Sequence, residues 1–411
     1  MSATEVINPN KQMSGQSVRL LYVCDWPPSN FGGGPILMSR LLREYPADTI
    51  TVLTSTRFAR VSPKEGRLEC DEITVPLSEG YGRFGLGRLR ILLNWLRIPL
   101  IAFRVRRVIR QREIAAILTV LHGQFYFAAA LAGWVTGVPY IVIVHDDYAT
   151  EMNFLGRWAT RAVMNGAAHI YCVSPGMQET IRCNFGVDAE LQPPAAERRE
   201  HGPVRAAGRE ITIVYAGSIT AAVEDNLKLL ATLITSGRLT GYGVDAKLHL
   251  YTVVKQEQKR EWGWDHPNIV IHAWVGQAEL PNVLCNADIL FLPFSFAPEE
   301  RHTVKTAFPS KTADYLASGT PILVFGPKYS SLVAYALREG FGEIVMEPEG
   351  ELLVQAIQRI ARDARHREML SRRSMTVFSK YHDIAQQRTD FVRLLNTIVR
   401  ETSPQPASTR A

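Results

Sequence analysis

Short apolar runs recur along the chain, with enough residues between them for a helix. In the first half they cover residues 18–24, 50–53, 114–120, 140–144 and 169–173. In the second half they cover residues 211–216, 247–251, 268–272, 288–292 and 321–325. Continuous apolar strands that alternate with helices are typical of a parallel sheet covered by helices on both faces. The pattern predicts an α/β fold with two doubly wound, Rossmann-like domains that face each other across a cleft.

A segment rich in proline and charge, residues 191–203, separates the two sets of runs and shows no periodicity. Such a composition is typical of a linker between domains. We therefore predict a first domain at residues 17–195, a linker at 196–208 and a second domain at 209–380. We also expect a disordered lead-in at 1–16, a last helix at 381–400 and a disordered tail at 401–411.

The cysteines fit neither a disulfide framework nor a zinc site, because their number is odd and no C-x-x-C pair occurs. This usage favours a reducing, cytoplasmic compartment. The first sixteen residues lack the apolar segment of a secretory signal, and no run of 18 uncharged apolar residues is present. We expect neither a secretory signal nor a transmembrane helix.

One stretch is strongly basic. Residues 83–112 hold nine arginines and no acidic residue, although the net charge of the whole chain is only +6. Arginines recur there every seven residues, which places them near one helical face: Arg83, Arg90, Arg97 and Arg104. Pro99 is expected to split the stretch into two helices.

Two interpretations of this basic stretch stay open. A basic amphipathic helix with a tryptophan favours an anionic membrane surface, which Arg90, Arg97 and Arg104 would face. The alternative is a surface helix with a solvated arginine face. No RNA- or DNA-binding motif accompanies the charge, so nucleic acid is not an expected partner.

Two polar clusters follow strands of the first domain. Gly32, Gly33 and Gly34 come after the first strand, where backbone N–H groups can approach an anion. Their spacing is not G-x-G-x-x-G, and a flexible turn is the alternative. His145, Asp146 and Asp147 follow the strand at 140–144. A histidine there could bind a sugar hydroxyl or carry a proton, whereas the alternative is an ordinary strand cap.

Two further clusters lie in the second domain. Gly217 and Ser218 follow its first strand, where small residues let a phosphate meet the backbone, although any βα turn can look this way. The segment 301–321 supplies positive side chains that could meet a diphosphate, namely Arg301, Lys305 and Lys311. Asp314, on the helix expected at 310–318, could accept both hydroxyls of a ribose. A solvated basic loop before an amphipathic helix is the alternative.

Several segments together resemble a known family: FGGGP (31–35), GVPYIVIVHDDY (137–148), VYAGSI (214–219), ADILFLPF (287–294) and FPSKTADYLASGTPILVF (308–325). They are similar to the retaining glycosyltransferases of the two-Rossmann "B" architecture (GT-B), in particular family four. The resemblance spans residues 18–400. Residues 378–395 are similar to the family's terminal helix, which crosses back to the first domain.

The resemblance implies roles at matching positions. His145 and Asp146 would be catalytic, with His145 touching the transferred sugar, and Asp314 would hold the nucleotide ribose. The remaining donor-binding residues would be Gly33, Gly34, Gly217, Ser218, Arg301, Lys305, Thr306, Ser310 and Lys311. It also implies retention of the anomeric configuration, no metal and no other cofactor.

Two family features are changed in this chain. The family often has two glutamates eight positions apart, and here those positions are Thr306 and Asp314. The family also often has an arginine and a lysine after the first strand of the second domain, where this chain has Ser218 and Asn226. Arg301, Lys305 or Lys311 would have to replace that pair at the diphosphate.

The function expected from these features is transfer of a hexose-type sugar from a nucleoside-diphosphate sugar to a glycan or lipid-linked acceptor. We expect a role in cell-surface polysaccharide biosynthesis, in the cytoplasm or on the inner face of the membrane. Two alternatives remain: a sugar-nucleotide epimerase of the same fold, and an inactive scaffold subunit that keeps only the fold.

Overall fold

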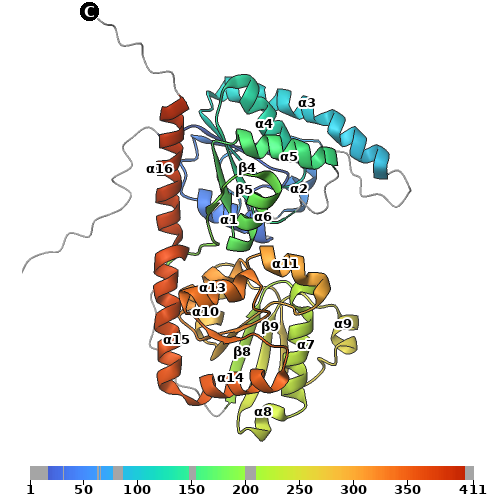
Figure 1. The fold of residues 1–411 in the computed structure, drawn as a ribbon, viewed down its shortest axis with the longest axis vertical. Coiled ribbons are helices and arrows are strands. Elements are labelled where there is room, and N and C mark those ends of the chain that lie inside the picture. Colours follow the sequence, from blue (N-terminus) through green and yellow to red (C-terminus); the bar gives the residue numbers. More distant parts are fainter. Residues whose placement is uncertain are drawn as a thin grey trace, which may run out of the picture.

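The computed structural model of the chain describes residues 17–30, 32–62, 64, 66–76, 87–147, 154–199 and 210–402. They form two α/β domains, one above the other in Figure 1, with the last helices running along one side of both. The prediction of an α/β fold with two doubly wound domains is confirmed.

The described part of the first domain has a seven-stranded parallel sheet in the order β3-β2-β1-β4-β5-β6-β7. The strands are β1 (Leu20–Val23), β2 (Ile50–Ser55), β3 (Asp71–Val75), β4 (Ala116–Val120), β5 (Tyr140–Val144), β6 (His169–Cys172) and β7 (Glu190–Leu191). The helices are α1 (Gly33–Leu42), α2 (Thr56–Val61), α3 (Gly87–Arg112), α4 (Phe125–Thr136), α5 (Phe154–Gly166) and α6 (Pro175–Phe185).

The second domain has a six-stranded parallel sheet in the order β10-β9-β8-β11-β12-β13. The strands are β8 (Glu210–Ala216), β9 (Asp245–Tyr251), β10 (Ile269–His272), β11 (Ile289–Pro293), β12 (Ile322–Phe325) and β13 (Glu343–Val345). The helices are α7 (Ala221–Thr235), α8 (Arg238–Gly241), α9 (Gln256–Glu261), α10 (Leu280–Cys285), a 3-10 turn (Pro298–Glu300), α11 (Arg301–Thr306), α12 (Lys311–Ser318), α13 (Ser331–Glu339) and α14 (Gly350–Arg362). Helix α15 (Ala364–Val377), a π-helical turn (Phe378–His382) and α16 (Ile384–Thr402) end the described chain.

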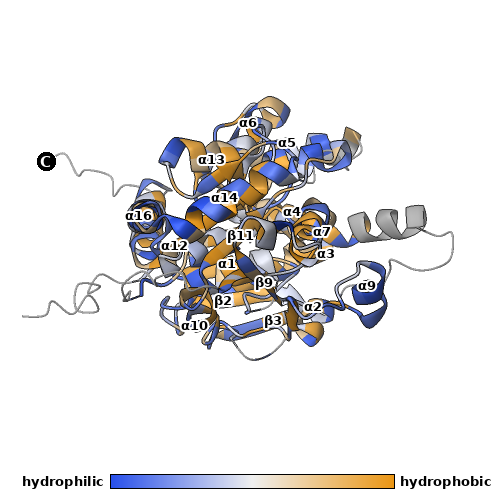
Figure 2. Cartoon of the chain, turned by 90° about the horizontal axis from the view of Figure 1, so that it is seen from below, coloured by the Kyte–Doolittle hydropathy of each residue, from blue (hydrophilic) through white to orange (hydrophobic). Residues whose placement is uncertain are grey.

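The central strands are apolar because helices cover both faces of each sheet. Every residue of β1, β4, β5 and β11 is buried. Figure 2 shows hydrophobic residues around β2 and β9 in the interior, whereas the outlying helix α9 is hydrophilic. Because both faces of the central strands are buried, continuous apolar runs were enough to predict their positions from the sequence.

The last helix returns to the first domain. Phe391, Leu395 and Ile398 of α16 are buried in the same hydrophobic cluster as Leu20 and Tyr22 of β1. Figure 1 shows α15 beside the second domain and α16 beside the first. The chain therefore passes between the domains twice, at the linker and at the turn before α16.

Three strands escaped the sequence analysis for physical reasons. Most residues of β3 are exposed at the sheet edge, and β7 and β13 have only two and three residues. Helix α1 begins at Gly33, so Gly33 and Gly34 form its first turn.

The prediction that Pro99 splits the basic stretch was wrong, because α3 runs unbroken through it. Ile98, Ile101, Ala102 and Val105 are buried on either side of Pro99 in the core of the first domain. Pro99 itself is exposed. A proline costs a helix one backbone hydrogen bond, and here the packing of the apolar face outweighs that loss.

Candidate active site between the two domains

A cavity of about 630 Å³ lies between the domains. Arg40 of α1 and Arg43, directly after α1, line it from the first domain, and Gln277 and Asp314 line it from the second. A second cavity, of about 210 Å³, lies at the carboxyl ends of β1, β4 and β5. The residues around this smaller cavity include Gly33, Gly34, His122, His145 and Asp146, besides Trp26. The smaller cavity lies where open parallel sheets bind ligands, whereas the larger one is lined by the C-terminal part of α1 and by residues that precede β2 and β3.

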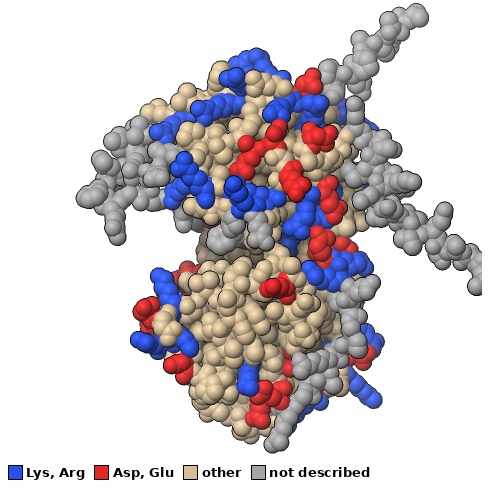
Figure 3. Space-filling model, turned by 180° about the vertical axis from the view of Figure 1, so that it is seen from behind, with Lys and Arg blue, Asp and Glu red and all other residues tan. Residues whose placement is uncertain are grey.

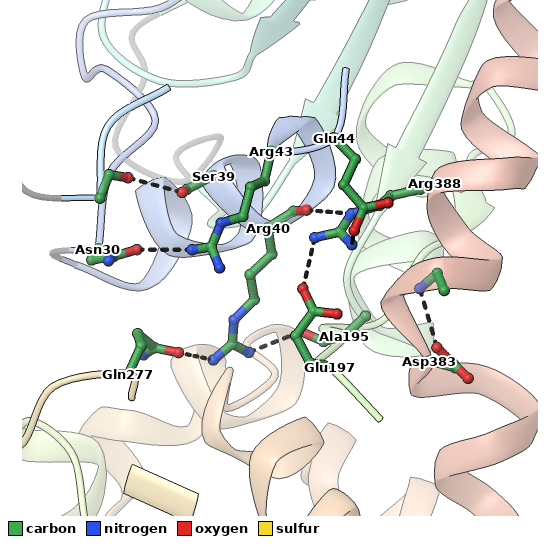
Figure 4. Close-up of polar contacts among 12 residues, drawn as sticks. Asn30, Ser39, Arg40, Arg43, Glu44, Ala195, Glu197, Gln277, Asp383 and Arg388 are labelled. Carbon is green, nitrogen blue, oxygen red and sulfur yellow. Dashed lines mark hydrogen bonds and ion pairs between the residues drawn. The ribbon is translucent and has the colours of Figure 1, made fainter. Parts of the chain in front are cut away.

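Arg40 closes the larger cavity against Asp314. Its Nη2 donates to both carboxylate oxygens of Asp314, at 2.9 and 3.0 Å, and also to Gln277. Its Nη1 donates to the carbonyl oxygen of Ala195 at 2.8 Å. Figure 4 shows the guanidinium of Arg40 pointing from α1 toward Gln277 and Ala195. The carboxylate predicted to hold a ribose therefore lies against an arginine of the other domain.

Arg388 of α16 binds the backbone of Arg40 (Figure 4). Its Nε donates to the carbonyl oxygen of Arg40 at 2.9 Å, and its Nη2 donates to Glu197 at 2.8 Å. Its Nη1 also pairs with Glu44 at 2.5 Å. One buried arginine thus connects α1, the start of the linker and the last helix, which fixes α1 where the domains meet.

The glycines of α1 come close to residues of both domains. A Cβ added at Gly34 would lie 2.9 Å from Nδ1 of His145, and one added at Gly33 would lie 3.9 Å from Oγ of Ser310. Gly34 therefore leaves no room for a side chain beside His145. Burial lowers the pKa of His145 to about 4, so its ring is neutral at neutral pH. A neutral ring there can hydrogen-bond a sugar hydroxyl.

Lys311 and Gly217 adjoin on the second domain. Nζ of Lys311 donates to Oη of Tyr215 at 2.6 Å, and a Cβ at Gly217 would lie 2.6 Å from that Nζ. Burial lowers the pKa of Lys311 to about 7. Ser218 is exposed in the same loop, and its carbonyl oxygen accepts from Tyr215. The structure thus brings Gly217, Ser218 and Lys311 together, as a diphosphate site would require.

Other predicted donor residues lie differently. Thr306 is buried, and its hydroxyl donates to the carbonyl oxygen of His302 within α11. Thr306 lines neither of the two cavities, so its predicted role in donor binding stays a prediction. Arg301 stacks on the ring of Tyr329, with its Cζ 4.1 Å from the ring centroid. Lys305 is exposed, and its backbone packs against Gly176 of α6.

The remaining acidic residues of the first domain lie near the rim. Asp146 is exposed and lines the smaller cavity. Asp147 is largely buried and pairs with Nε2 of His302 at 2.7 Å, across the domain boundary. This pair and the pair between Arg40 and Asp314 hold the two domains together at two separate places. Sequence analysis did not identify Arg40, His302 or Arg388, because none of them stands in a recognisable motif.

The basic helix α3 carries exposed apolar side chains. Leu96, Leu100 and Phe103 are each more than 60% exposed, and Arg104 is exposed while Arg97 is partly so. The side chain of Arg90 falls outside the described residues. Figure 3 shows Lys and Arg side chains gathered over the first domain on its rear face. Within the described ranges, no helix combines the length and apolarity needed to cross a membrane.

Comparisons with known proteins agree with this architecture. Residues 32–192 match a family model described as a glycosyl transferase 4-like domain. A comparison with curated protein sequences gave no significant match.

Solved structures have the same two-domain fold. HepE of Anabaena in complex with UDP is 12% identical, with a TM-score of 0.63, over 92% of this chain and 100% of that one. Its complex with UDP-glucose matches similarly. Sucrose-phosphate synthase of Thermosynechococcus elongatus is 14% identical, with a TM-score of 0.63, over 92% and 99% of the chains. WaaG, a glycosyltransferase involved in lipopolysaccharide biosynthesis, is 12% identical, with a TM-score of 0.56, over the same shares. The chain therefore has the GT-B fold, and its residues 32–192 match the glycosyl transferase 4-like domain.

Proposed function

We propose that the chain transfers a sugar from a nucleoside-diphosphate sugar to an acceptor hydroxyl in the cleft between its domains. The observation that carries this proposal is that each domain contributes candidate site residues to this cleft. Gly217, Lys311 and Asp314 come from the second domain, and Gly34 and His145 come from the first. HepE, whose complexes hold UDP and UDP-glucose, has the same fold. That likeness supports a nucleotide sugar as the donor class.

The proposed mechanism assigns the leaving diphosphate to Lys311 and the N-terminus of α12. A protonated lysine and aligned backbone amides stabilise negative charge as it develops on the diphosphate. Asp314 accepts the ribose hydroxyls once Arg40 has released it. The nucleoside then occupies the larger cavity, whose volume of about 630 Å³ is in the usual range for ligand sites. His145 hydrogen-bonds a hydroxyl of the transferred sugar, and Asp146 stands beside it.

The finer features of the proposal come from family resemblance. We propose retention of the anomeric configuration, no requirement for a metal ion, and a glycan or lipid-linked acceptor in cell-surface polysaccharide biosynthesis. This part is supported by WaaG, which has the same fold and is involved in lipopolysaccharide biosynthesis. The anomeric configuration of the isolated product tests retention directly.

The donor class is tested by a thermal-shift screen against a panel of nucleoside-diphosphate sugars. A donor at about 100 times its dissociation constant adds about 2.7 kcal/mol of stability, so the correct donor should raise the melting temperature clearly. Incubation of that donor with candidate acceptors should then give a glycoside. Conversion of the donor to an epimer would identify an epimerase. A chain that no donor stabilises would be a scaffold.

We also propose that α3 attaches the first domain to an anionic membrane. The support is the exposed Leu96, Leu100 and Phe103 next to basic side chains on one helix. Each basic residue near an anionic leaflet contributes about 1 kcal/mol. Replacing Arg90, Arg97 and Arg104 together with glutamine should therefore weaken binding to phosphatidylglycerol vesicles about 100-fold.

Vesicle co-sedimentation measures this effect. The matched control replaces three exposed arginines of the second domain, Arg260, Arg338 and Arg372, and should sediment like the wild type. Equal sedimentation of both triple variants would remove the membrane proposal. Wild-type binding to neutral phosphatidylcholine vesicles should be weak, because they offer no negative charge.

A further inference from the structure

Trp26 forms one wall of the smaller cavity, outside the residues of the proposed donor site. It follows β1, so it lies at the same carboxyl edge of the sheet as the other cavity residues. Its ring stacks on that of Phe58 in α2, with the ring centroids 4.0 Å apart and an angle of 21° between the planes. Phe58 therefore covers one face of the indole, and the other face or the edge borders the cavity.

The indole of Trp26 is held in place by the elements around it. The hydroxyl of Tyr22 donates to the carbonyl oxygen of Trp26 at 3.3 Å. Oγ of Ser55 accepts from the backbone N–H of Phe58 at 3.2 Å and donates to the carbonyl oxygen of Asp25 at 3.0 Å. These bonds tie the start of α2 to the residue before Trp26. A side chain fixed in this way loses little conformational entropy when a ligand binds.

Trp26 and the residue proposed to hold the transferred sugar lie at opposite edges of the cavity. The strand order there is β1, β4, β5, and Trp26 follows the first of these strands while His145 follows the third. Neighbouring strands are about 4.8 Å apart, so the two residues come from strands about 10 Å apart. A ligand against Trp26 would therefore lie beside the sugar that His145 holds.

The size and lining of the cavity suit one sugar ring. Its volume of about 210 Å³ is below the range of roughly 300–1,000 Å³ for sites that enclose drug-sized ligands, so it does not fit a lipid chain or a whole nucleotide sugar. The negative face of an aromatic ring attracts the slightly positive C–H groups of a sugar. Apolar side chains (Val120, Leu121) and hydrogen-bonding ones (His122, His145) form other parts of the wall.

Positive side chains are missing from this wall. Of the described residues that line the cavity, none is a lysine or an arginine. Arg57 lies over the ring of Phe58, with its Cζ 5.2 Å from the centroid, but does not line the cavity. The N-terminus of α1 is positive, yet its Gly33 is directed at Ser310 and so at the proposed donor diphosphate. A phosphate or carboxylate group of an acceptor would find no cationic side chain on this wall.

The titratable groups on the wall also disfavour an anion. Asp146 is exposed and brings a negative charge to the cavity. Burial lowers the pKa of His145 to about 4, so its ring is neutral at neutral pH. Nδ1 of His122 lies 3.5 Å from the buried carboxylate of Asp25, so any positive charge on that ring already has a counter-charge. The wall therefore suits the hydroxyls of an uncharged ligand.

We propose that the acceptor is a neutral saccharide whose terminal ring stacks on Trp26. This inference rests on the proposed function. In the transfer, a hydroxyl oxygen of that ring bonds to the anomeric carbon. The bond from this carbon to the diphosphate breaks with its electron pair, and the departing diphosphate takes the hydroxyl proton. The chain then extends an existing glycan, so a different reaction must place the first sugar on any lipid phosphate.

Two sets of acceptors test the charge of the ligand. Transfer from the nucleotide sugar that stabilises the wild type is measured with neutral methyl glycosides of hexoses and their disaccharides. It is compared with transfer to methyl uronosides and to a polyprenyl phosphate in detergent. Placing an unpaired charge against this wall is unfavourable, so kcat/KM should be at least about tenfold higher for the best neutral glycoside than for the best anionic acceptor.

Replacing Trp26 tests the stacking. Trp26→Ala should raise the KM for the best neutral glycoside about tenfold and leave kcat close to that of the wild type, because the stacking acts before and during the reaction. Trp26→Phe keeps an aromatic face and should restore most of the affinity. The donor-induced thermal shift should persist in both variants, which shows that the fold and the donor site are intact. The matched control, Trp158→Ala, changes an exposed tryptophan of α5 and should keep the wild-type KM.

The inference would be overturned by a preference for an anionic acceptor, by the lack of transfer to any neutral glycoside, or by an unchanged KM in Trp26→Ala. In each of these cases a nucleotide sugar still stabilises the wild-type chain. Failure of the proposed function is seen separately, because then no nucleotide sugar stabilises the chain and none is consumed with any acceptor.

Discussion

Replacing Lys311 with methionine is expected to weaken donor binding by about 10- to 100-fold without destabilising the fold. A hydrogen bond to a charged group contributes about 1.5–3 kcal/mol, and the donor diphosphate would lose one. The free chain loses little, because methionine has a similar length and brings no charge into the buried site. Tyr215 still donates its hydroxyl to Ser218. Isothermal titration and urea unfolding measure the two effects.

The same lysine predicts proton uptake when the donor binds. Its pKa is about 7 in the free chain, so above that pH it is mostly neutral. A bound diphosphate favours the charged form and raises the pKa. Binding at about pH 8.5 should therefore take up close to one proton, whereas binding well below pH 7 should take up almost none. Titrations in buffers with different ionisation enthalpies measure the number of protons.

The control for both experiments is Lys328→Met, which changes an exposed lysine of the same domain. It should leave donor affinity and proton uptake as they are in the wild type. Undiminished affinity in Lys311→Met would mean that this lysine is only a packing residue beneath the Gly217 loop.

The second large effect concerns the last helix. Phe391→Ala should lower the free energy of unfolding by about 3–5 kcal/mol, the usual cost of removing a buried phenylalanine. Phe391 is 1% exposed and packs with the strands of the first domain, although it lies near the end of the chain. The first domain thus depends on residues that follow the whole second domain.

Urea unfolding of the full chain measures this cost. Thr397→Ala changes an exposed position of the same helix and should cost less than about 0.5 kcal/mol. If Phe391→Ala were equally mild, α16 would not be an integral part of the first domain's core.

The sequence predicted well what depends on local pattern. Strands such as 140–144 are buried on both faces, so their composition alone defines them. Residues that directly follow such strands, like His145 and Gly217, could be placed at the carboxyl ends of the sheets for the same reason. The exposed strand β3 has no such composition and was missed. The expectation that a proline ends a helix was wrong at Pro99, because Ile98 and Ile101 pack in the core beside it.

What depends on the arrangement of the two domains could not be predicted. Arg40 contacts Asp314 only because α1 lies against the second domain. No spacing in the sequence indicates that contact between the domains. Asp25 and His122 are 97 positions apart, so they meet only because β1 and β4 are neighbours in the sheet. Thr306 and Lys311 stand in one recognisable segment, yet helix geometry buries the hydroxyl of the first and aims the second at Gly217.

The central claim is that Asp314 binds the ribose of a nucleotide-sugar donor and that Arg40 covers it in the free chain. Donor affinities of Arg40→Met and Asp314→Ala test it most directly. Arg43→Met is the control, because Arg43 lines the same cavity but bonds to Asn30. The account predicts opposite changes: about tenfold tighter binding for Arg40→Met, at least tenfold weaker binding for Asp314→Ala, and no change for Arg43→Met. Equal weakening in Arg40→Met and Asp314→Ala would contradict it, since Asp314 would then serve only to join the domains.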